Sequence, residues 1–116
     1  MLSENINHNL KKMKIQINTD NNVSGNESRN EALITLLSEG LSRFSDQISR
    51  IEVHLSDEDG NKDGLNDIRC MLEVRLEGRP PVAVTNHSSS SELAVKGAIE
   101  KLKNMLTTSL GRLKNF

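Results

Sequence analysis

Apolar and polar residues alternate along three consecutive segments between residues 51 and 87. The alternation is clearest in residues 51–55, 68–77 and 82–85. A two-residue period is typical of β-strands that bury one face and expose the other to solvent. The pattern therefore predicts three consecutive antiparallel strands whose apolar face needs a covering layer.

A segment before these strands has the spacing of an amphipathic α-helix. Its apolar stripe consists of Leu33, Leu36, Leu37, Leu41 and Phe44. Ser24 and Glu27 have capping-box spacing, with Asn26 and Ser28 as alternative cap residues. The pattern predicts one continuous helix that ends at about Phe44. Gly40 lies beside the stripe, which favours close approach to the sheet or to a second helix.

A second amphipathic helix is predicted after the strands, where Ser89 and Glu92 again have capping-box spacing. Its apolar face comprises Val95, Ala98, Ile99, Leu102, Met105, Leu106, Leu110 and Leu113. Its other faces carry basic and polar residues, namely Lys96, Lys101, Lys103, Asn104, Thr107, Thr108, Arg112 and Lys114. Such a helix covers a sheet and exposes its basic residues to solvent.

These elements define an α+β fold in the order β-α-β-β-β-α. Residues 13–17 alternate and predict a short first strand, which a right-handed crossover makes parallel to the second. Both helices are expected on one face of the four-stranded sheet, as in double-stranded-RNA-binding domains. Pro80 and Pro81 precede the last strand and favour an edge position, because proline donates no ladder hydrogen bond.

The length and composition are typical of a small cytoplasmic protein. We expect residues 1–12, which are polar and lack a period, to form a flexible leader before a single domain at 13–116. No apolar run approaches the roughly 20 residues that span a bilayer, and no secretory signal is evident. The single cysteine, Cys70, cannot form an internal disulfide, which fits a reducing compartment. Its strand position predicts a small buried hydrophobe.

Charge is distributed unevenly, although the formal net charge is only −1. Residues 51–67 contain six acidic residues and one lysine, whereas residues 92–116 contain five basic and two acidic residues. The molecule is therefore expected to be electrically bipolar, with a basic last helix that can attract phosphate.

One segment resembles the first half of a calcium loop. Asp59, Asn61 and Asp63 place oxygen donors at alternate positions before Gly64. Cys70 occupies the position of the bidentate glutamate, so a solvated hairpin turn is the favoured interpretation.

The histidines do not form a recognisable zinc site in the sequence. His54 and His87 fall on the predicted open face of the sheet, with no third ligand evident beside them, and His8 lies in the leader. No nucleophile–base pair, glycine-rich phosphate loop or carboxylate pair in a cleft is recognisable. We therefore expect no enzymatic activity, no cofactor and no small-molecule substrate.

The open face of the predicted sheet is polar and contains no aromatic residue. The residues expected there include Lys14, Gln16, Asn18, Arg69, Arg75 and Thr85. Without aromatic residues, recognition of single strands by base stacking is not expected. The basic last helix leaves two interpretations, contact with a phosphate backbone or a solvated helix face.

Three stretches resemble the ribosome hibernation-promoting factors and their relative, ribosome-associated inhibitor A. They are residues 41–48 (LSRFSDQI), 51–55 (IEVHL) and 97–102 (GAIEKL), and residues 112–114 (RLK) resemble the basic end of the family's final helix. The resemblance extends over residues 13–115 and includes the element order. It is a resemblance to the short form, without the C-terminal dimerisation domain of the long form.

This resemblance implies a cytoplasmic stress factor that binds the small ribosomal subunit through its rRNA. Translation is then repressed by occlusion of the mRNA and tRNA channel, with no membrane partner and with a monomer expected off the ribosome. Lys101, Arg112 and Lys114 match basic positions of the family's final helix, and Lys103 stands in for a neighbouring one. The full set of expected RNA-binding residues is Lys96, Lys101, Lys103, Arg112 and Lys114 on the helix, with Arg69 and Arg75 on the open face.

A second interpretation is a protein-interaction or stress adaptor of the same fold with weak or no RNA binding. Leu37 and Gly40 replace lysines that are common in the family's first helix, and Thr108 and Leu110 do so in the last. The acidic hairpin at residues 56–64 (SDEDGNKDG) then provides the contact surface for a protein partner.

Overall fold

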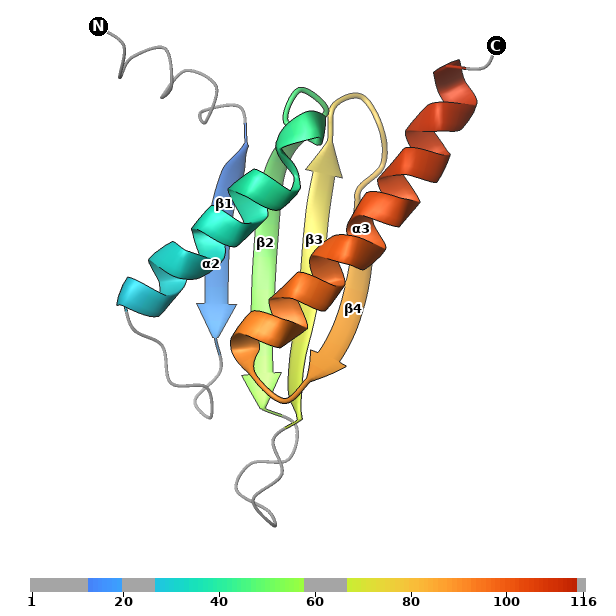
Figure 1. Ribbon diagram of the computed structural model, residues 1–116. Coiled ribbons are helices and arrows are strands. Elements are labelled where there is room, and N and C mark those ends of the chain that lie inside the picture. The colour runs from blue at the N-terminus through green and yellow to red at the C-terminus, as the bar shows by residue number, and fades with distance from the viewer. Residues whose placement is uncertain (1–12, 20–26, 58–66, 115–116) are drawn as a thin grey trace, which may run out of the picture.

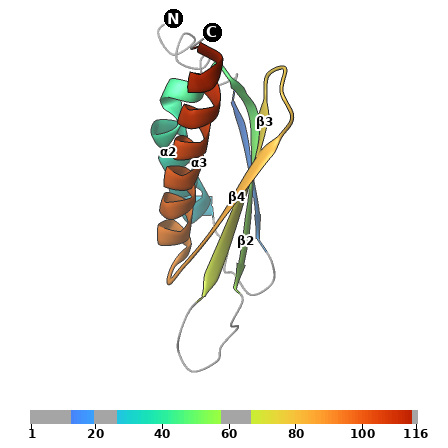
Figure 2. The ribbon, with the colours of Figure 1, turned by 90° about the vertical axis from the view of Figure 1, so that its right-hand side faces the viewer.

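Two helices cover one face of a four-stranded sheet in the computed structural model of the chain (Figure 1). The structure describes residues 13–19, 27–57 and 67–114, with side chains as far as Ser109. The elements are β1 (Lys14–Thr19), α2 (Glu27–Gly40), the 3₁₀-helix η1 (Ser42–Phe44), β2 (Ile48–Asp57), β3 (Ile68–Leu76), β4 (Val82–Ser88) and α3 (Ser91–Lys114). Figure 2 shows the sheet edge-on, with both α-helices on the same side. The predicted α+β order and the placement of the helices are confirmed.

The strands follow one another in space in the order β1-β2-β3-β4. β1 pairs with β2 in parallel, with Ile15 opposite Ile51, whereas the other two pairs are antiparallel. The parallel first pair agrees with the predicted crossover through α2. β4 lies at an edge of the sheet, as the two prolines before it indicated.

A β-bulge explains why β2 begins earlier than the alternation suggested. The pairing register with β3 shifts between Ile48 and Arg50, so one extra residue enters β2 there. Ile48 and Ile51 are both buried although they are three residues apart. A strict two-residue period cannot place both on one face, and the predicted strand therefore started at Ile51 instead of Ile48.

The core lies between the helices and the covered face of the sheet. Val53 of β2 and Leu72 of β3 are fully buried in this core, as are Leu37 of α2 and Leu102 of α3. Burying one such aliphatic side chain contributes roughly 1.5–3 kcal/mol. Among the described residues, no polar or charged residue falls in the buried class. The apolar face predicted from the alternation is therefore the face that the helices cover.

The prediction of one helix running to Phe44 is wrong, because α2 ends at Gly40. The backbone N–H of Leu41 still bonds the carbonyl of Leu37 at 3.0 Å, but the N–H of Phe44 then bonds the carbonyl of Leu41 at 2.9 Å. The change to three-residue hydrogen bonds tightens the chain into η1. Leu41 and Phe44 remain buried in the new geometry, so the apolar stripe is kept although the α-helix is not.

Gly40 brings the end of α2 close to α3, one of the two alternatives that its position suggested. A Cβ atom at residue 40 would lie 2.9 Å from Cγ2 of Ile99. Real Cβ atoms do not approach neighbours this closely, so any larger residue must move the branched side chain of Ile99 or the helix itself. The absence of a side chain at Gly40 therefore sets the distance between the two helices.

α3 begins one residue later than the predicted capping box. The hydroxyl of Ser90 accepts a hydrogen bond from the backbone N–H of Leu93 at 3.2 Å, so Ser90, and not Ser89, caps the helix. Asn86 of β4 donates from Nδ2 to the carbonyl of Ala94 at 3.2 Å. A Cβ atom at Gly97 would lie only 2.1 Å from that nitrogen. Gly97 therefore makes room for the polar contact that joins the first turns of α3 to β4.

The predicted apolar face of α3 is confirmed as far as its side chains are described. The buried positions include Val95, Ala98, Ile99, Leu102 and Leu106. Met105 is 36% exposed and lies at the border of this face. Within the described residues, no helix is long and apolar enough to cross a membrane.

Several predicted features lie outside the described residues. They are the leader at 1–12, the candidate caps Ser24 and Asn26, the calcium-like residues 59–64, and the side chains of Leu110 and Leu113.

Cys70 is buried on the covered face of β3, as predicted. Loss of hydration raises the pKa of the Cys70 thiol to about 12, an effect that the nearby Arg69 guanidinium opposes. The folded protein therefore keeps the thiol protonated at neutral pH. Above the ordinary thiol pKa of 9.0 the unfolded chain loses this proton first, so Cys70 lowers the stability as the pH rises from 9.0 toward 12.

Replacing Cys70 with serine tests this burial. We expect Cys70→Ser to lower the free energy of unfolding by about 1–3 kcal/mol, because it buries a hydroxyl in an apolar site. Urea denaturation measures the loss, and Cys70→Ala is the matched control that shortens the side chain without adding a polar group. Rapid modification of the native protein by a thiol reagent at pH 8 would contradict the burial.

Replacing Gly40 with alanine tests the contact between the helices. We expect Gly40→Ala to lower the free energy of unfolding by about 1–3 kcal/mol, the usual cost of overpacking. In an Ile99→Ala background the added methyl group has room, so Gly40→Ala should lower the free energy of unfolding much less. A double-mutant cycle measured by urea denaturation gives the difference. An equal loss in both backgrounds would mean that the contact with Ile99 does not limit this site.

Candidate nucleic-acid interface

Lys96 and Lys103 of α3 each form an ion pair with a glutamate of the same helix. Nζ of Lys96 lies 3.4 Å from a carboxylate oxygen of Glu92, and Nζ of Lys103 lies 3.5 Å from one of Glu100. Both are pairs within one helix on a solvated surface, where an ion pair contributes at most about 1 kcal/mol. Neither pairing therefore prevents these lysines from binding phosphate.

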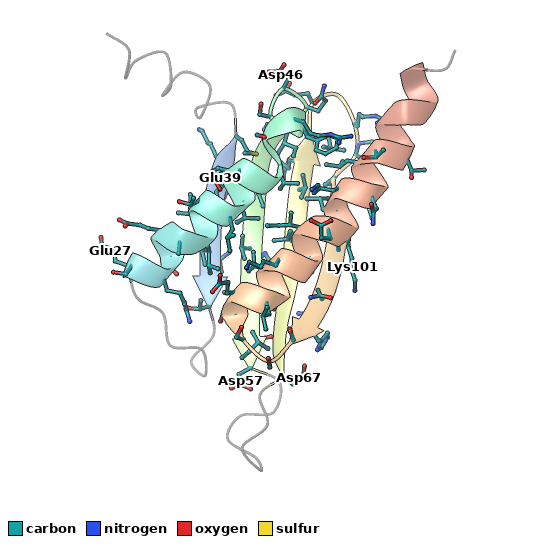
Figure 3. The ribbon with its side chains drawn as sticks, in the orientation of Figure 1. Glu27, Glu39, Asp46, Asp57, Asp67 and Lys101 are labelled. Carbon is teal, nitrogen blue, oxygen red and sulfur yellow. The ribbon has the colours of Figure 1, made fainter. Side chains whose placement is uncertain are left out.

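Lys101 lies nearer to the sheet than the other two lysines. Its Nζ donates a hydrogen bond to the backbone carbonyl of Thr85 in β4 at 2.7 Å. Figure 3 shows the Lys101 side chain leaving α3 on the side of this edge strand. Because the carbonyl oxygen carries no full negative charge, the positive charge of Lys101 stays uncompensated. The ammonium group also has two further N–H donors. Lys101 therefore covers part of the sheet edge and still presents a positive charge to solvent.

Two arginines from other elements flank the C-terminal half of α3. Nη2 of Arg43 donates to Oγ1 of Thr107 at 3.3 Å, and its guanidinium lies 4.8 Å from the centre of the Phe44 ring. Nη1 of Arg79, in the turn between β3 and β4, donates to Oγ of Ser109 at 3.3 Å. We call Arg43, Arg79, Thr107 and Ser109 the helix-end cluster.

Thr107 and Ser109 of the helix-end cluster lie shortly before Arg112 and Lys114 in α3. The side chains of Arg112 and Lys114 lie outside the described residues. Arg43 and Arg79 were not among the RNA-binding residues predicted from the sequence. Arg43 lies within a stretch that carries the family resemblance, whereas nothing local distinguishes Arg79 from an ordinary turn residue. Its place beside α3 follows only from the packing of the β3–β4 turn.

A row of three basic residues crosses the open face of the sheet. The register places Lys14 of β1 opposite Arg50 of β2, and Arg50 opposite Arg75 of β3. We call these three residues the open-face row; with Ser49 and Glu52 they line a shallow depression. Arg50 was missed in the sequence. Continuing the alternation backwards from Ile51 would have placed it on this face.

Arg69 does not join this row. It lies six residues before Arg75 on the same strand, which corresponds to about 20 Å along β3. Its cross-strand neighbour is His87, whose Nδ1 lies 2.9 Å from Oδ1 of Asp67. The predicted RNA-binding residues therefore occupy separate places, with the lysines on α3 and the two arginines at opposite ends of the open face.

Basic and acidic residues are separated along the strand direction of the sheet. The open-face row lies where β1 and β2 begin and β3 ends, and α3 has its C-terminus at the same end (Figure 1). Asp57 and Asp67 lie at the opposite end (Figure 3). Asp46 adds a negative charge at the basic end. The arrangement of the described residues agrees with the bipolar distribution expected from the sequence.

The open face also brings a histidine between two carboxylates. Nε2 of His54 lies 3.5 Å from Oε1 of Glu52 and 3.2 Å from Oε1 of Glu73. A third metal ligand beside a histidine was not evident in the sequence. Glu73 is distant from His54 in the chain and reaches it only through strand pairing.

Two solved structures share this fold over nearly the whole of their length. The N-terminal domain of protein Y from Thermus thermophilus matches with a TM-score of 0.65 and 18% identity, covering 83% of this chain and 98% of that domain. A ribosomal subunit interface protein from Coxiella burnetii matches with a TM-score of 0.65 and 22% identity, covering 85% and 99% of the respective chains. No protein-family model and no curated protein sequence matches the chain.

The weak pairing of the α3 lysines can be tested by neutralising them. We expect Lys96→Gln and Lys103→Gln each to change the free energy of unfolding by less than about 0.5 kcal/mol, because exposed substitutions rarely cost more. Urea denaturation at low and high salt measures this. A loss well above 1 kcal/mol would assign these lysines a structural role instead of a free charge.

Proposed function

We propose that this chain is a ribosome hibernation factor that binds the small ribosomal subunit and represses translation. The observation that carries the proposal is the fold, which it shares over more than four-fifths of its length with a ribosomal subunit interface protein. The stretches that resemble the hibernation-promoting factors lie in the same fold, on η1, β2 and α3. Two independent likenesses, one of sequence pattern and one of structure, thus support the same function.

Binding is proposed to rest on contacts with the phosphates of rRNA. Arg43 and Arg79, from two other segments, lie beside the turn of α3 that precedes Arg112 and Lys114 in the sequence. Lysine and arginine on a helix face contact phosphates without reading bases. The open face contains no aromatic residue among the described positions, which agrees with recognition of the backbone instead of stacked bases.

Repression is proposed to follow from occupancy of the mRNA and tRNA channel, without chemistry on the ribosome. A two-layer domain with a continuous aliphatic core keeps its shape when it is bound, so it excludes other ligands from the volume that it fills. The protein acts in the cytoplasm and is a monomer off the ribosome in this proposal.

Charge reversal at the end of α3 tests the proposed contact. We expect the helix variant, Lys101→Glu with Arg112→Glu and Lys114→Glu, to leave the small-subunit fractions of a sucrose gradient, because phosphate repels the new carboxylates. The affinity of the parent chain should fall steeply with salt, with a log–log slope of roughly −0.7 to −0.9 for each phosphate contacted. Circular dichroism should show an unchanged fold.

An open-face variant of equal charge change is the matched control. Lys14→Glu, Arg69→Glu and Arg75→Glu also reverse three basic residues, but they do so away from α3. We expect this variant to keep more binding than the helix variant. The opposite result would move the contact to the open face. Equal binding by both variants and the parent would contradict phosphate recognition and favour a protein-interaction adaptor that uses the acidic end.

A further inference from the structure

Three potential metal ligands converge at the centre of the open face. Glu52 of β2 is directly opposite Glu73 of β3, and His54 is the next residue of β2 on the same face. Nε2 of His54 lies 3.5 Å from Oε1 of Glu52 and 3.2 Å from Oε1 of Glu73. One ligand atom from each of the three residues lies within 4.8 Å of the other two. Among the described residues, this is the group of three with metal-ligand chemistry.

Arg50 orients the first carboxylate of this group. Its Nε donates to Oε2 of Glu52 at 2.9 Å, and its Nη2 donates to Oε1 of Gln16. Because Arg50 occupies Oε2, the other oxygen of Glu52 is the one that faces His54. Metal-binding carboxylates are commonly fixed in this way by a second group that does not itself touch the metal.

The strand pairing places two carboxylates side by side, of which Arg50 pairs with the first. Like charges directly opposite each other on neighbouring strands destabilise the pair, and Glu52 and Glu73 occupy such positions. Both carboxylates line a depression with Arg50, Arg75 and Pro81. The side chains of Glu52, His54 and Glu73 are 31%, 34% and 53% exposed, so an ion reaches them directly from solvent.

We propose that Glu52, His54 and Glu73 form a zinc-binding site with a fourth position for water. Zinc binds imidazole nitrogen and carboxylate oxygen at about 2.0–2.2 Å, which places tetrahedral ligand atoms about 3.3–3.5 Å apart. The two distances from His54, 3.5 Å to Glu52 and 3.2 Å to Glu73, are close to this value. Magnesium and calcium prefer sites made of oxygen alone, whereas imidazole favours zinc and its transition-metal neighbours.

The site does not depend on ribosome binding, since its ligands belong to the open face and not to α3. A bound ion joins β2 to β3 and turns the repulsion between two carboxylates into shared attraction. Because it binds the folded state, zinc should raise the thermal midpoint of unfolding as its concentration rises.

Zinc titration of the full chain by calorimetry tests the site. We expect one zinc ion for each chain, and an affinity at least about tenfold lower in His54→Ala and in Glu73→Gln. His87→Ala is the matched control, because it removes a histidine from the same face that has Asp67 beside it. This control should bind zinc like the parent. Cobalt in place of zinc should give the visible absorption of a four-coordinate ion in the parent and not in His54→Ala.

Several results would overturn the proposal. One is the absence of saturable zinc binding by the parent chain. Another is unchanged affinity in His54→Ala, which would assign the ion to other residues, such as His8 or the acidic segment after Asp57. Equal weakening in His87→Ala would indicate adventitious binding at surface histidines. Circular dichroism of every variant distinguishes loss of the zinc site from loss of the fold.

Discussion

The structure depends on the burial of one apolar sheet face beneath two helices. Val53 and Leu72, at the centre of the sheet, and Leu37 and Leu102, from the helices, are completely buried. Each such side chain contributes roughly 1.5–3 kcal/mol, so their sum outweighs any single polar contact on the surface. Because the sheet has one apolar face, both helices must lie on the same side. The other face is then left to solvent and to whatever binds there.

This constraint also arranges the charges. Once alternate residues of β2 and β3 are buried, those between them must all point to the open face, where Arg50 meets Arg75 and Glu52 meets Glu73. The length of α3 carries its basic end past the core to the end of the sheet where β3 finishes (Figure 1). A chain with a net charge near zero therefore has a basic end and an acidic end, which favours an oriented encounter with a polyanion.

Local breaks in regular geometry account for the errors in predicting the elements. The bulge at the start of β2 adds one residue and hides Ile48 from a search for two-residue alternation. The change from α2 to η1 keeps Leu41 and Phe44 in the core, so the apolar spacing alone did not show where the α-helix stops. Gly40 is the last residue of α2 and marks that position in the sequence, because glycine has a low helix propensity.

The sequence by itself determined the element order, the covered face, the edge position of β4 and the burial of Cys70, because each follows from local periodicity or from proline chemistry. It also identified Lys96 and Lys101 of α3 as exposed. Only the tertiary structure decided which distant residues meet. The placement of Arg79 beside Ser109, of Arg50 between Lys14 and Arg75, and of Glu73 beside His54 depends on strand register and helix packing. Register is set by the joint burial of both strands and by the bulge, so no single segment contains that information.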